Sequence, residues 1–481
     1  MCDAIFITFI IYLTAVFVIG LGVSWYYRRS PASTTDLMLG GRTTHWFFTA
    51  LSAHAADMSD WLFMGLPAAV YLHGGTQIWI PIGLLCGMAA AWQFVARPLR
   101  VMSATYGAST IAAFFQKRYN DQTGLIGVVT ALISCFFFTI YISVGLKGIG
   151  FVLSSIFGID YHVGIGIALL VILTYMLLGG FNSVAVLDMI QGLFLLAMLT
   201  LVPWVGYRVV GGWGAITAAA QLKGISLALL PDLSWYTLLS IFLNPFSWAL
   251  GYFGMPHILT KFMGTGNPDD IRKAQYVGVT WQLLAMGAAV CVGLVGIPFF
   301  MNGLLKPELI FVEMTTTLFA PCMAGIILCA IVAATISTVD SQLLVLASIV
   351  TEDFYKTFVN PRANYAQLRW VYAVTLIISA LIGFTIAWHE ASTIMGLVRY
   401  AWAGLGAAFG PLMLVSLYNM YPNRWGALAG IIAGGTVAAT WDLINPYVTT
   451  MPIYAMVPAY AASFAAIYSV SWLTENYPPK K

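Results

Sequence analysis

Long apolar runs alternate with short polar segments along the whole of this chain. An α-helix needs about 20 mainly apolar residues to cross about 30 Å of hydrocarbon, so each long run is a candidate transmembrane helix. An odd number of such helices places the two termini on opposite sides of a membrane. We predict thirteen helices, at residues 4–25, 46–72, 75–96, 124–156, 162–180, 184–207, 234–258, 275–302, 315–350, 368–388, 392–417, 425–443 and 451–473.

The distribution of basic residues predicts the orientation, because lysine and arginine favour the cytoplasmic loops of membrane proteins. With the N-terminus outside, most of the 21 Lys and Arg residues fall on inner loops, and Lys261 is counted among them. The outer loops then hold Arg208, Lys223 and Lys306. We therefore predict a multi-pass protein of the plasma membrane, with the N-terminus outside and the C-terminus in the cytoplasm.

The overall composition agrees with a membrane protein. Of the 481 residues, 60% are hydrophobic and only 8% are charged, whereas soluble domains carry about 25% charged residues. The composition therefore argues against a soluble enzyme. A net charge of +3 is too small to indicate nucleic acid as a partner. The six cysteines contain no CxxC pair, so we expect neither a disulfide framework nor a metal cluster. The sequence indicates membrane lipid as its surroundings and no obligate protein partner.

Two of the predicted helices carry interruptions in their middle. In the second helix, residues 50–61 are mostly small or polar, and such a stretch favours a broken helix. In the seventh helix, Pro245 and Pro256 with two glycines between them weaken the hydrogen-bond ladder. Unwound backbone at this depth is tolerated where it lines a cavity or binds an ion. The interruptions are five helices apart, as expected for two inverted repeats, although two kinked packing helices would give the same pattern.

The ninth helix contains a polar face. Ala334, Ser337, Thr338 and Ser341 are spaced so that they share one side of a helix. Two hydroxyl groups, together with carbonyl groups of a broken helix, would form an all-oxygen cage for a monovalent cation. Hydroxyl groups in membrane helices also bond to neighbouring helices, so this pattern alone leaves both interpretations open.

Several blocks of the sequence resemble the sodium/solute symporter family, and most closely its bacterial sodium/proline symporters. The resemblance implies an all-α integral membrane protein with thirteen transmembrane helices and a LeuT-type 5+5 inverted-repeat core. It also implies one extra N-terminal and two extra C-terminal helices, with segments at 1–45, 46–210, 211–417 and 418–481. The blocks are LSAHAADMSDWLFMGLP (51–67), FTIYISVG (138–145), GYFGMPHILTKFM (251–263), AATISTVDSQLLVLAS (333–348) and VRYAWAGLGAAFGP (398–411).

Site residues follow from the resemblance position by position. The sodium site implied by the family uses carbonyl or hydroxyl oxygens of Ala55, Met58, Ala334, Ser337 and Thr338, with Asp57 as a nearby carboxylate. The implied substrate pocket contains Trp61, Gly65, Tyr141, Trp248, Tyr252 and Pro256. A second cation site, for sodium or a proton, is implied at Asp188, Ser337, Asp340 and Ser341. No catalytic residue and no cofactor other than sodium, the coupling ion, is expected.

Four residues depart from the pattern expected for the family, namely His54, Asp60, Lys147 and Arg399. For Lys147 we favour an ammonium that extends toward the outer interface, with pairing to an acid or contact with a carboxylate as alternatives. The resemblance implies sodium-coupled uptake of L-proline across the bacterial inner membrane by alternating access. The alternatives are a sodium- or proton-coupled symporter of another small carboxylate, a vitamin or a sugar acid, or a solute sensor that does not transport.

Overall fold

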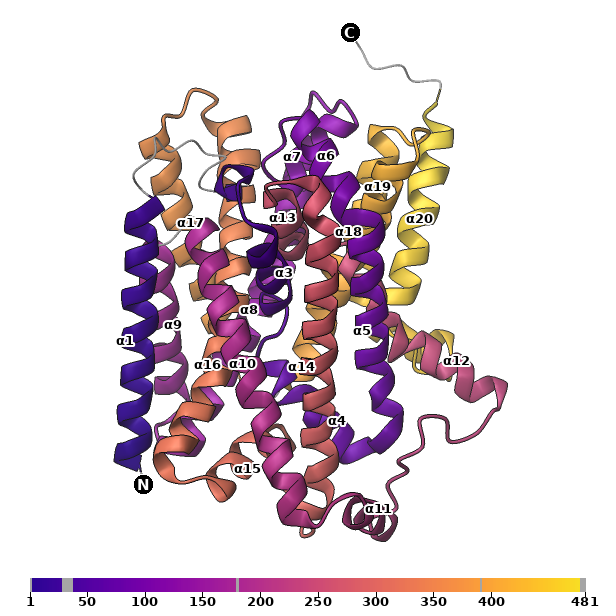
Figure 1. Cartoon of the computed structure of the whole chain (residues 1–481). Coiled ribbons are helices and arrows are strands. Elements are labelled where there is room, and N and C mark those ends of the chain that lie inside the picture. Colours follow the sequence, from indigo (N-terminus) through magenta and orange to yellow (C-terminus); the bar gives the residue numbers. More distant parts are fainter. Residues whose placement is uncertain (1, 28–37, 179–180, 390–391, 476–481) are drawn as a thin grey trace.

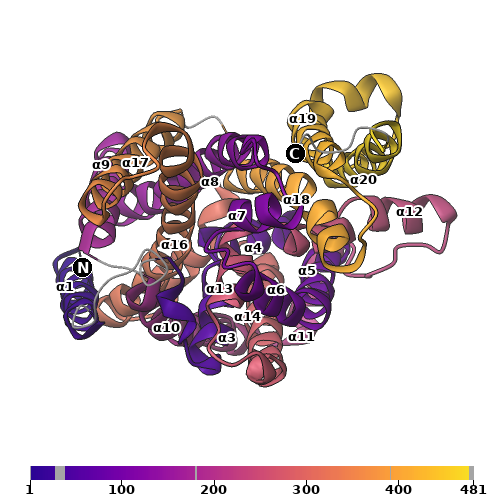
Figure 2. The ribbon, with the colours of Figure 1, turned by 90° about the horizontal axis from the view of Figure 1, so that it is seen from above.

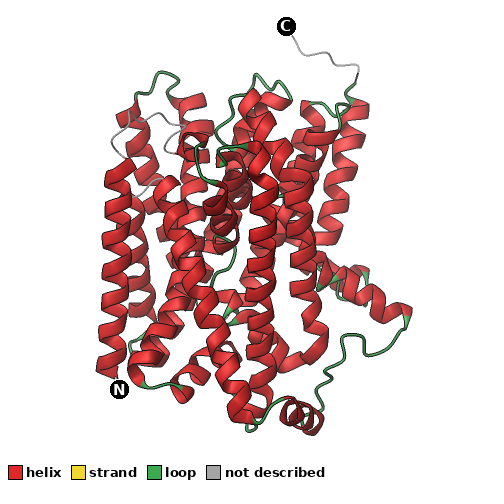
Figure 3. Cartoon of the chain, viewed as in Figure 1, coloured by secondary structure: helices red, strands yellow, loops and turns green. Residues whose placement is uncertain are grey.

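The computed structural model describes residues 2–27, 38–178, 181–389 and 392–475, and within these ranges the chain folds as helices without strands (Figures 1 and 3). The first half contains α1 (Cys2–Tyr27), η1 (Gly40–Arg42), α3 (Trp46–Ala55), η2 (Asp60–Leu62), α4 (Gly65–His73), η3 (Gly74–Ile78), α5 (Trp79–Ala90), η4 (Ala91–Ala96), α6 (Arg97–Thr105), α7 (Ile111–Arg118), α8 (Leu125–Phe157), α9 (Tyr161–Leu178), α10 (Phe181–Val210) and α11 (Trp213–Leu222). The second half contains α12 (Trp235–Leu243), η5 (Phe246–Phe253), α13 (Pro256–Gly264), η6 (Pro268–Asp270), α14 (Ile271–Phe299), η7 (Pro307–Leu309), α15 (Ile310–Leu318), α16 (Pro321–Ser348), η8 (Ile349–Val359), α17 (Tyr365–Ala387), α18 (Ile394–Tyr418), α19 (Arg424–Val448) and α20 (Met456–Leu473).

The length and apolar character of these helices make this a multi-pass membrane protein. Among the described residues, 10 helical segments are long and apolar enough to cross a membrane, or 11 if the bent pair Trp235–Phe253 and Pro256–Gly264 forms one span. These segments do not reproduce the expected thirteen. One continuous segment, Asp60–Thr105, joins the second part of the expected helix 46–72 to the expected helix 75–96, and the described apolar stretch of α9, Tyr161–Thr174, is shorter than a span.

The interruption predicted in the second helix is confirmed. The helix α3 ends at Ala55 and α4 begins at Gly65, with only a short 3-10 turn between them. Ser59 is extended, and the amides of Asp57 and Met58 turn back to the carbonyls of His54 and Ala55 instead of continuing the ladder. The segment is buried, so its small and polar side chains are enclosed by other helices and do not meet lipid.

The interruption in the seventh helix is also confirmed. The helix α12 ends at Leu243, two residues before Pro245, and the chain continues as the 3-10 segment η5. Met255 is extended and Pro256 occupies the first turn of α13, where its missing N–H removes no hydrogen bond. The axis bends by 40° at this break.

The broken helices lie inside the bundle. Figure 2 shows α1 at one rim and the pair α19 and α20 at another, with α4 and α13 between them. The helix α16 is buried along most of its length. Figure 1 shows that the start of α1 and the end of α20 lie at opposite ends of the bundle. The interrupted backbone is therefore surrounded by protein, as its freed polar groups require.

The peripheral helices α19 and α20 pack against each other through glycines. A Cβ at Gly426 would lie 1.9 Å from the hydroxyl of Ser471, and one at Gly430 would lie 2.3 Å from Ile467. These contacts leave no room for a side chain, so the glycines allow α19 to approach α20 closely.

Candidate functional site

The oxygen atoms predicted to bind sodium converge where α3 ends against α16. The Ser337 hydroxyl donates to the carbonyl of Ala55 at 3.1 Å and to that of Ala334 at 2.9 Å. The Thr338 hydroxyl lies 3.4 Å from the same Ala55 carbonyl. Met58 is buried beside them, and its amide bonds to that carbonyl at 3.3 Å. The structure therefore brings four of the five predicted oxygens together, whereas the Met58 carbonyl accepts no hydrogen bond that joins it to this cluster among the described residues.

The chemistry of this cluster suits a small hard cation. All its groups are neutral oxygens, and each residue is 1% exposed or less. Hard cations bind oxygen at about 2.3–2.6 Å, so adjacent ligands in an octahedral shell lie about 3.3–3.7 Å apart. The observed separations of 2.9–3.4 Å are slightly shorter, so small outward shifts would produce a cation cage.

Asp57 links the two broken helices. Its carboxylate accepts a hydrogen bond from the hydroxyl of Tyr252 on η5, and Gln282 on α14 donates to that hydroxyl at 3.0 Å. The indole of Trp61 donates to the Asp57 carbonyl at 2.9 Å. The other carboxylate oxygen of Asp57 has no hydrogen-bond partner among the described residues. Asp57 is thus held between the two unwound segments, next to the Ala55 and Met58 backbone.

Three predicted substrate residues line one small buried cavity, which in this structure is too narrow to hold a water molecule. Its walls are formed by Asp57, Trp61, Leu84, Tyr141, Trp248, Val398 and Trp402. Tyr252 on η5 is not one of these walls, but it packs against Trp402, with the two ring centroids 5.1 Å apart in an edge-on arrangement. The Tyr141 hydroxyl is buried without a hydrogen-bond partner among the described residues.

Gly65 and Pro256 lie outside the walls of this small cavity. Gly65 lines a larger cavity nearby, and a Cβ there would lie 3.3 Å from the sulfur of Met395. Pro256 starts α13, and its carbonyl accepts from the Thr260 hydroxyl at 2.7 Å. These two positions shape the breaks and the approach to the cavity.

Trp402 was missed as a site residue. Its indole donates to the carbonyl of Trp248 at 3.0 Å, and the two ring systems are stacked at 6.5 Å. The only sequence signal was a fully apolar run in which an aromatic residue at this position reads as packing. Contact between α18 and η5 converts it into a wall of the cavity.

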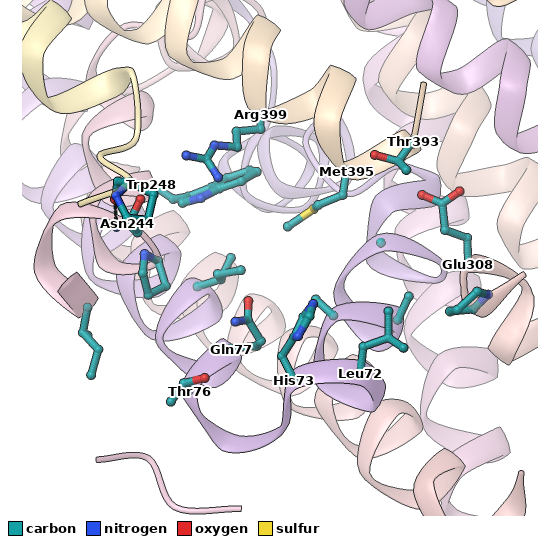
Figure 4. A pocket seen from close by; sticks show the side chains of 18 of the residues that line it. Leu72, His73, Thr76, Gln77, Asn244, Trp248, Glu308, Thr393, Met395 and Arg399 are labelled. Atoms are coloured by element: carbon teal, nitrogen blue, oxygen red, sulfur yellow. Dashed lines mark hydrogen bonds between the residues drawn. The ribbon is translucent and has the colours of Figure 1, made fainter. Parts of the chain in front are cut away.

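The larger cavity has a volume of about 920 Å³ and opens beside the small one (Figure 4). Trp248 lines both cavities and therefore separates them. Figure 4 shows Arg399 beside Trp248, with Met395 from the same helix, α18, next to it and with His73 and Gln77 on the opposite side of the cavity. The guanidinium of Arg399 lies 4.6 Å from the ring centre of Tyr454.

The far wall of the larger cavity carries an acidic side chain. The Glu308 carboxylate accepts from the amide of Ile394 at 2.9 Å. Burial raises the pKa of Glu308, while the amides of Ile394 and Met395 act in the opposite direction. Glu308 thus holds the start of α18 at the rim of the cavity.

Three of the departures from the expected pattern, His54, Asp60 and Lys147, are buried inside the bundle. Lys147 is buried, and its ammonium donates to the carbonyl and hydroxyl of Ser392 at 2.7 and 3.1 Å. The long side chain therefore reaches the segment before α18. His54 accepts from the indole of Trp92 at 3.1 Å. Asp60 is buried beside Gly148, and neither carboxylate oxygen has a hydrogen-bond partner among the described residues.

The residues predicted for a second cation site are only partly together. Three groups donate to one oxygen of Asp188: the Ser52 hydroxyl at 2.7 Å, the Lys261 ammonium at 2.9 Å and the Ser341 hydroxyl at 3.4 Å. Ser337 bonds instead within the first cluster. The carboxylate oxygens of Asp340 have no hydrogen-bond partner among the described residues.

The position of Lys261 corrects the assignment of basic residues to the inner loops. It was assigned to an inner loop, yet it lies on α13 and is 2% exposed. The signal for this was its position between apolar residues on both sides, Leu259 and Phe262.

Known proteins with similar sequences are transporters. Residues 37–434 match the model of the sodium:solute symporter family. The high-affinity proline transporter of Bacillus subtilis is 38% identical over 457 residues, covering 94% of this chain and 95% of that protein. A sodium/proline symporter of Staphylococcus aureus is 36% identical over 485 residues, covering 98% of this chain and 94% of that protein.

Solved structures share the fold. A sodium-coupled sialic acid symporter, solved in a substrate-bound outward-open state, superposes with a TM-score of 0.82 at 18% identity, covering 99% of each chain. A nucleobase-cation-symport-1 family transporter in a closed conformation superposes with a TM-score of 0.59 at 15% identity, covering 94% of this chain and 97% of that one. These neighbours have the LeuT fold, so the helices described above follow that architecture.

Proposed function

Because the chain belongs to the sodium:solute symporter family, we propose that it carries L-proline into the cell together with sodium. The family and the similar proteins are transporters, so the chain is a symporter and not an enzyme. The names of the Bacillus and Staphylococcus proteins support proline as the solute. The observation that carries the coupling is the convergence of the Ser337 and Thr338 hydroxyls on the Ala55 carbonyl at the end of α3.

In the proposed sodium site, the ion binds carbonyl oxygens of Ala55, Met58 and Ala334 and hydroxyl oxygens of Ser337 and Thr338. The dry environment strengthens each ion–dipole interaction, because little water competes. Asp57 supplies negative charge next to the site without a direct role as ligand. An ion bound there ties α3 of the first repeat to α16 of the second.

In the proposed substrate site, Trp61, Tyr141, Trp248 and Trp402 surround the pyrrolidine ring of proline. Their flat faces suit a compact apolar ring. Tyr252 and Gly65 shape the sides, and Pro256 begins α13, whose N-terminal amides and dipole favour the substrate carboxylate. The ion and the substrate then share the same two broken helices.

The proposed topology has thirteen spans. It counts α3 with α4, and α12 with η5 and α13, as one broken span each, and it adds α9 as a full span. Residues 46–210 and 211–417 form the inverted repeats, 1–45 and 418–481 the flanking helices. The N-terminus is outside the bacterial inner membrane and the C-terminus in the cytoplasm, which places the larger cavity on the outer side.

Transport proceeds by alternating access in this proposal. Proline enters the larger cavity, passes Trp248 and binds while sodium stabilises the contact between α3 and α16. Movement of one charge across 100 mV contributes about 2.3 kcal/mol and a tenfold sodium gradient about 1.4 kcal/mol, together enough for roughly 500-fold accumulation. One sodium per proline is therefore sufficient.

The test is uptake of labelled L-proline into proteoliposomes that hold the purified protein. We expect accumulation with an inward sodium gradient, and none with potassium or with a proton gradient alone. Competition by other amino acids and small carboxylates measures the selectivity. Uptake driven by protons without sodium would overturn the coupling, and sodium-driven uptake of a different carboxylate would overturn the substrate.

A further inference from the structure

A lysine occupies the region where the family resemblance implies a second cation. The Lys261 ammonium lies 2.9 Å from the carboxylate of Asp188, and the two side chains are 2% and 0% exposed. Four elements meet here, because Ser52 comes from α3, Asp188 from α10, Lys261 from α13 and Ser341 from α16. These are the helices whose relative movement alternating access requires.

The groups around the Lys261 ammonium are of the kind that surround a bound cation. It donates to Asp188 and lies 5.3 Å from the ring centre of Phe181, whose face attracts a cation. The hydroxyls of Ser52 and Ser341 donate to the same carboxylate oxygen, which therefore receives three donors. A buried carboxylate needs a compensating charge, and the nearest positive group is part of the chain itself.

We propose that Lys261 is the permanent occupant of the second cation site, so that the protein binds and couples a single sodium. The inference rests on the proposed sodium-coupled transport and specifies the number of sodium ions that take part in it. The ammonium of Lys261 belongs to α13 and supplies one positive charge beside Asp188. No second sodium ion therefore has to bind there during transport. The site at Ser337 and Thr338 is then the only one that sodium fills.

Removal of the ammonium turns the region into a site for a free cation. In the Lys261→Met variant, Asp188 and the Ser341 hydroxyl retain their oxygen atoms but lose the resident charge. Sodium is the small cation available to replace it. Lys261→Arg keeps the charge and serves as the conservative variant. Lys273→Met is the matched control, because Lys273 forms an ion pair of 2.7 Å with Asp270 at the surface.

The experiment counts bound radioactive sodium per chain at saturation, on the purified full-length protein without substrate. We expect one sodium for the wild type, one for Lys261→Arg and Lys273→Met, and two for Lys261→Met. The double variant Lys261→Met with Asp188→Asn, which removes both charges, returns the count to one. Ser337→Ala with Thr338→Ala lowers the wild-type count to zero.

Two results would overturn the inference. One is a count of two sodium ions in the wild type. This measurement does not depend on whether any variant folds. The other is a count of one in a folded Lys261→Met protein. The count is independent of the solute, so failure of proline uptake with one bound sodium contradicts the proposed substrate and leaves the inference standing.

Discussion

The hydroxyl of Tyr252 donates a hydrogen bond to the carboxylate of Asp57, and this bond joins the unwound segments of the two broken helices. The residues are 195 positions apart in the chain and both are buried. Asp57 follows the Ala55 carbonyl of the sodium site by two residues, and Tyr252 contacts the aromatic wall of the substrate cavity. The bond therefore connects the proposed ion site with the wall of the proposed substrate site.

Replacement of Tyr252 by Phe removes this connection while keeping the ring. A hydrogen bond to a carboxylate contributes about 1.5–3 kcal/mol, which corresponds to roughly 10- to 150-fold in an equilibrium constant. We expect the sodium concentration for half-maximal proline uptake to rise at least about tenfold. Tyr400→Phe is the control, because its hydroxyl bonds to the Ala439 carbonyl, away from Asp57. Equal sodium dependence in both variants would contradict the connection.

Replacement of Ser337 and Thr338 by Ala removes both hydroxyl ligands of the proposed sodium site. We expect the sodium requirement of uptake to rise more than about tenfold, because each lost ligand leaves the ion under-coordinated in a dry site. Sodium titration of proline uptake measures the change. Thr335→Ala on the same helix is the control, since its hydroxyl bonds to the carbonyl of Ile331 one turn earlier. An unchanged sodium titration in the double variant would remove the site.

Truncation of Trp248 to Ala opens the floor between the two cavities and removes one wall of the substrate site. We expect the KM for proline to rise at least about tenfold, since burial of an aromatic face contributes about 1.5–3 kcal/mol. Sodium binding measured without proline should be unchanged. Tyr141→Ala should behave in the same way, whereas Trp370→Ala, at an exposed position on α17, should not. Normal proline affinity in both cavity variants would displace the pocket.

The burial of the Glu308 carboxyl predicts that the stability of the protein depends on pH. Because burial raises its pKa above the ordinary value of 4.5, the folded state retains a proton that the unfolded state releases. Its contribution to the free energy of unfolding is therefore fully present below pH 4.5 and decreases as the pH rises through the raised pKa.

Melting temperatures measured across this pH range should show the effect as a difference between variants. The Glu308→Gln protein should lose less stability than the wild type as the pH rises. Glu475→Gln, at an exposed position, should follow the wild type. Parallel curves for the wild type and Glu308→Gln would contradict the role of burial.

Part of the site was predictable because the determinants are local. Pro245 and Pro256, with two glycines between them, weaken the helix locally, and the spacing of Ser337 and Thr338 places them on one face of α16. Trp402 was not predictable in this way. Its identity is that of an ordinary apolar helix residue, and only its bond to the Trp248 carbonyl makes it part of the cavity.

The sequence by itself determined that the chain is a bundle of apolar helices with two interruptions, because hydrophobic length and helix-breaking residues act within a few turns. Tertiary structure decided which polar groups meet. The charge of Lys261 is visible in the sequence, but its partner Asp188 lies 73 residues away on another helix. A pairing across that distance depends on how α10 and α13 pack, since a buried charge is compensated only by a group that the fold brings within contact.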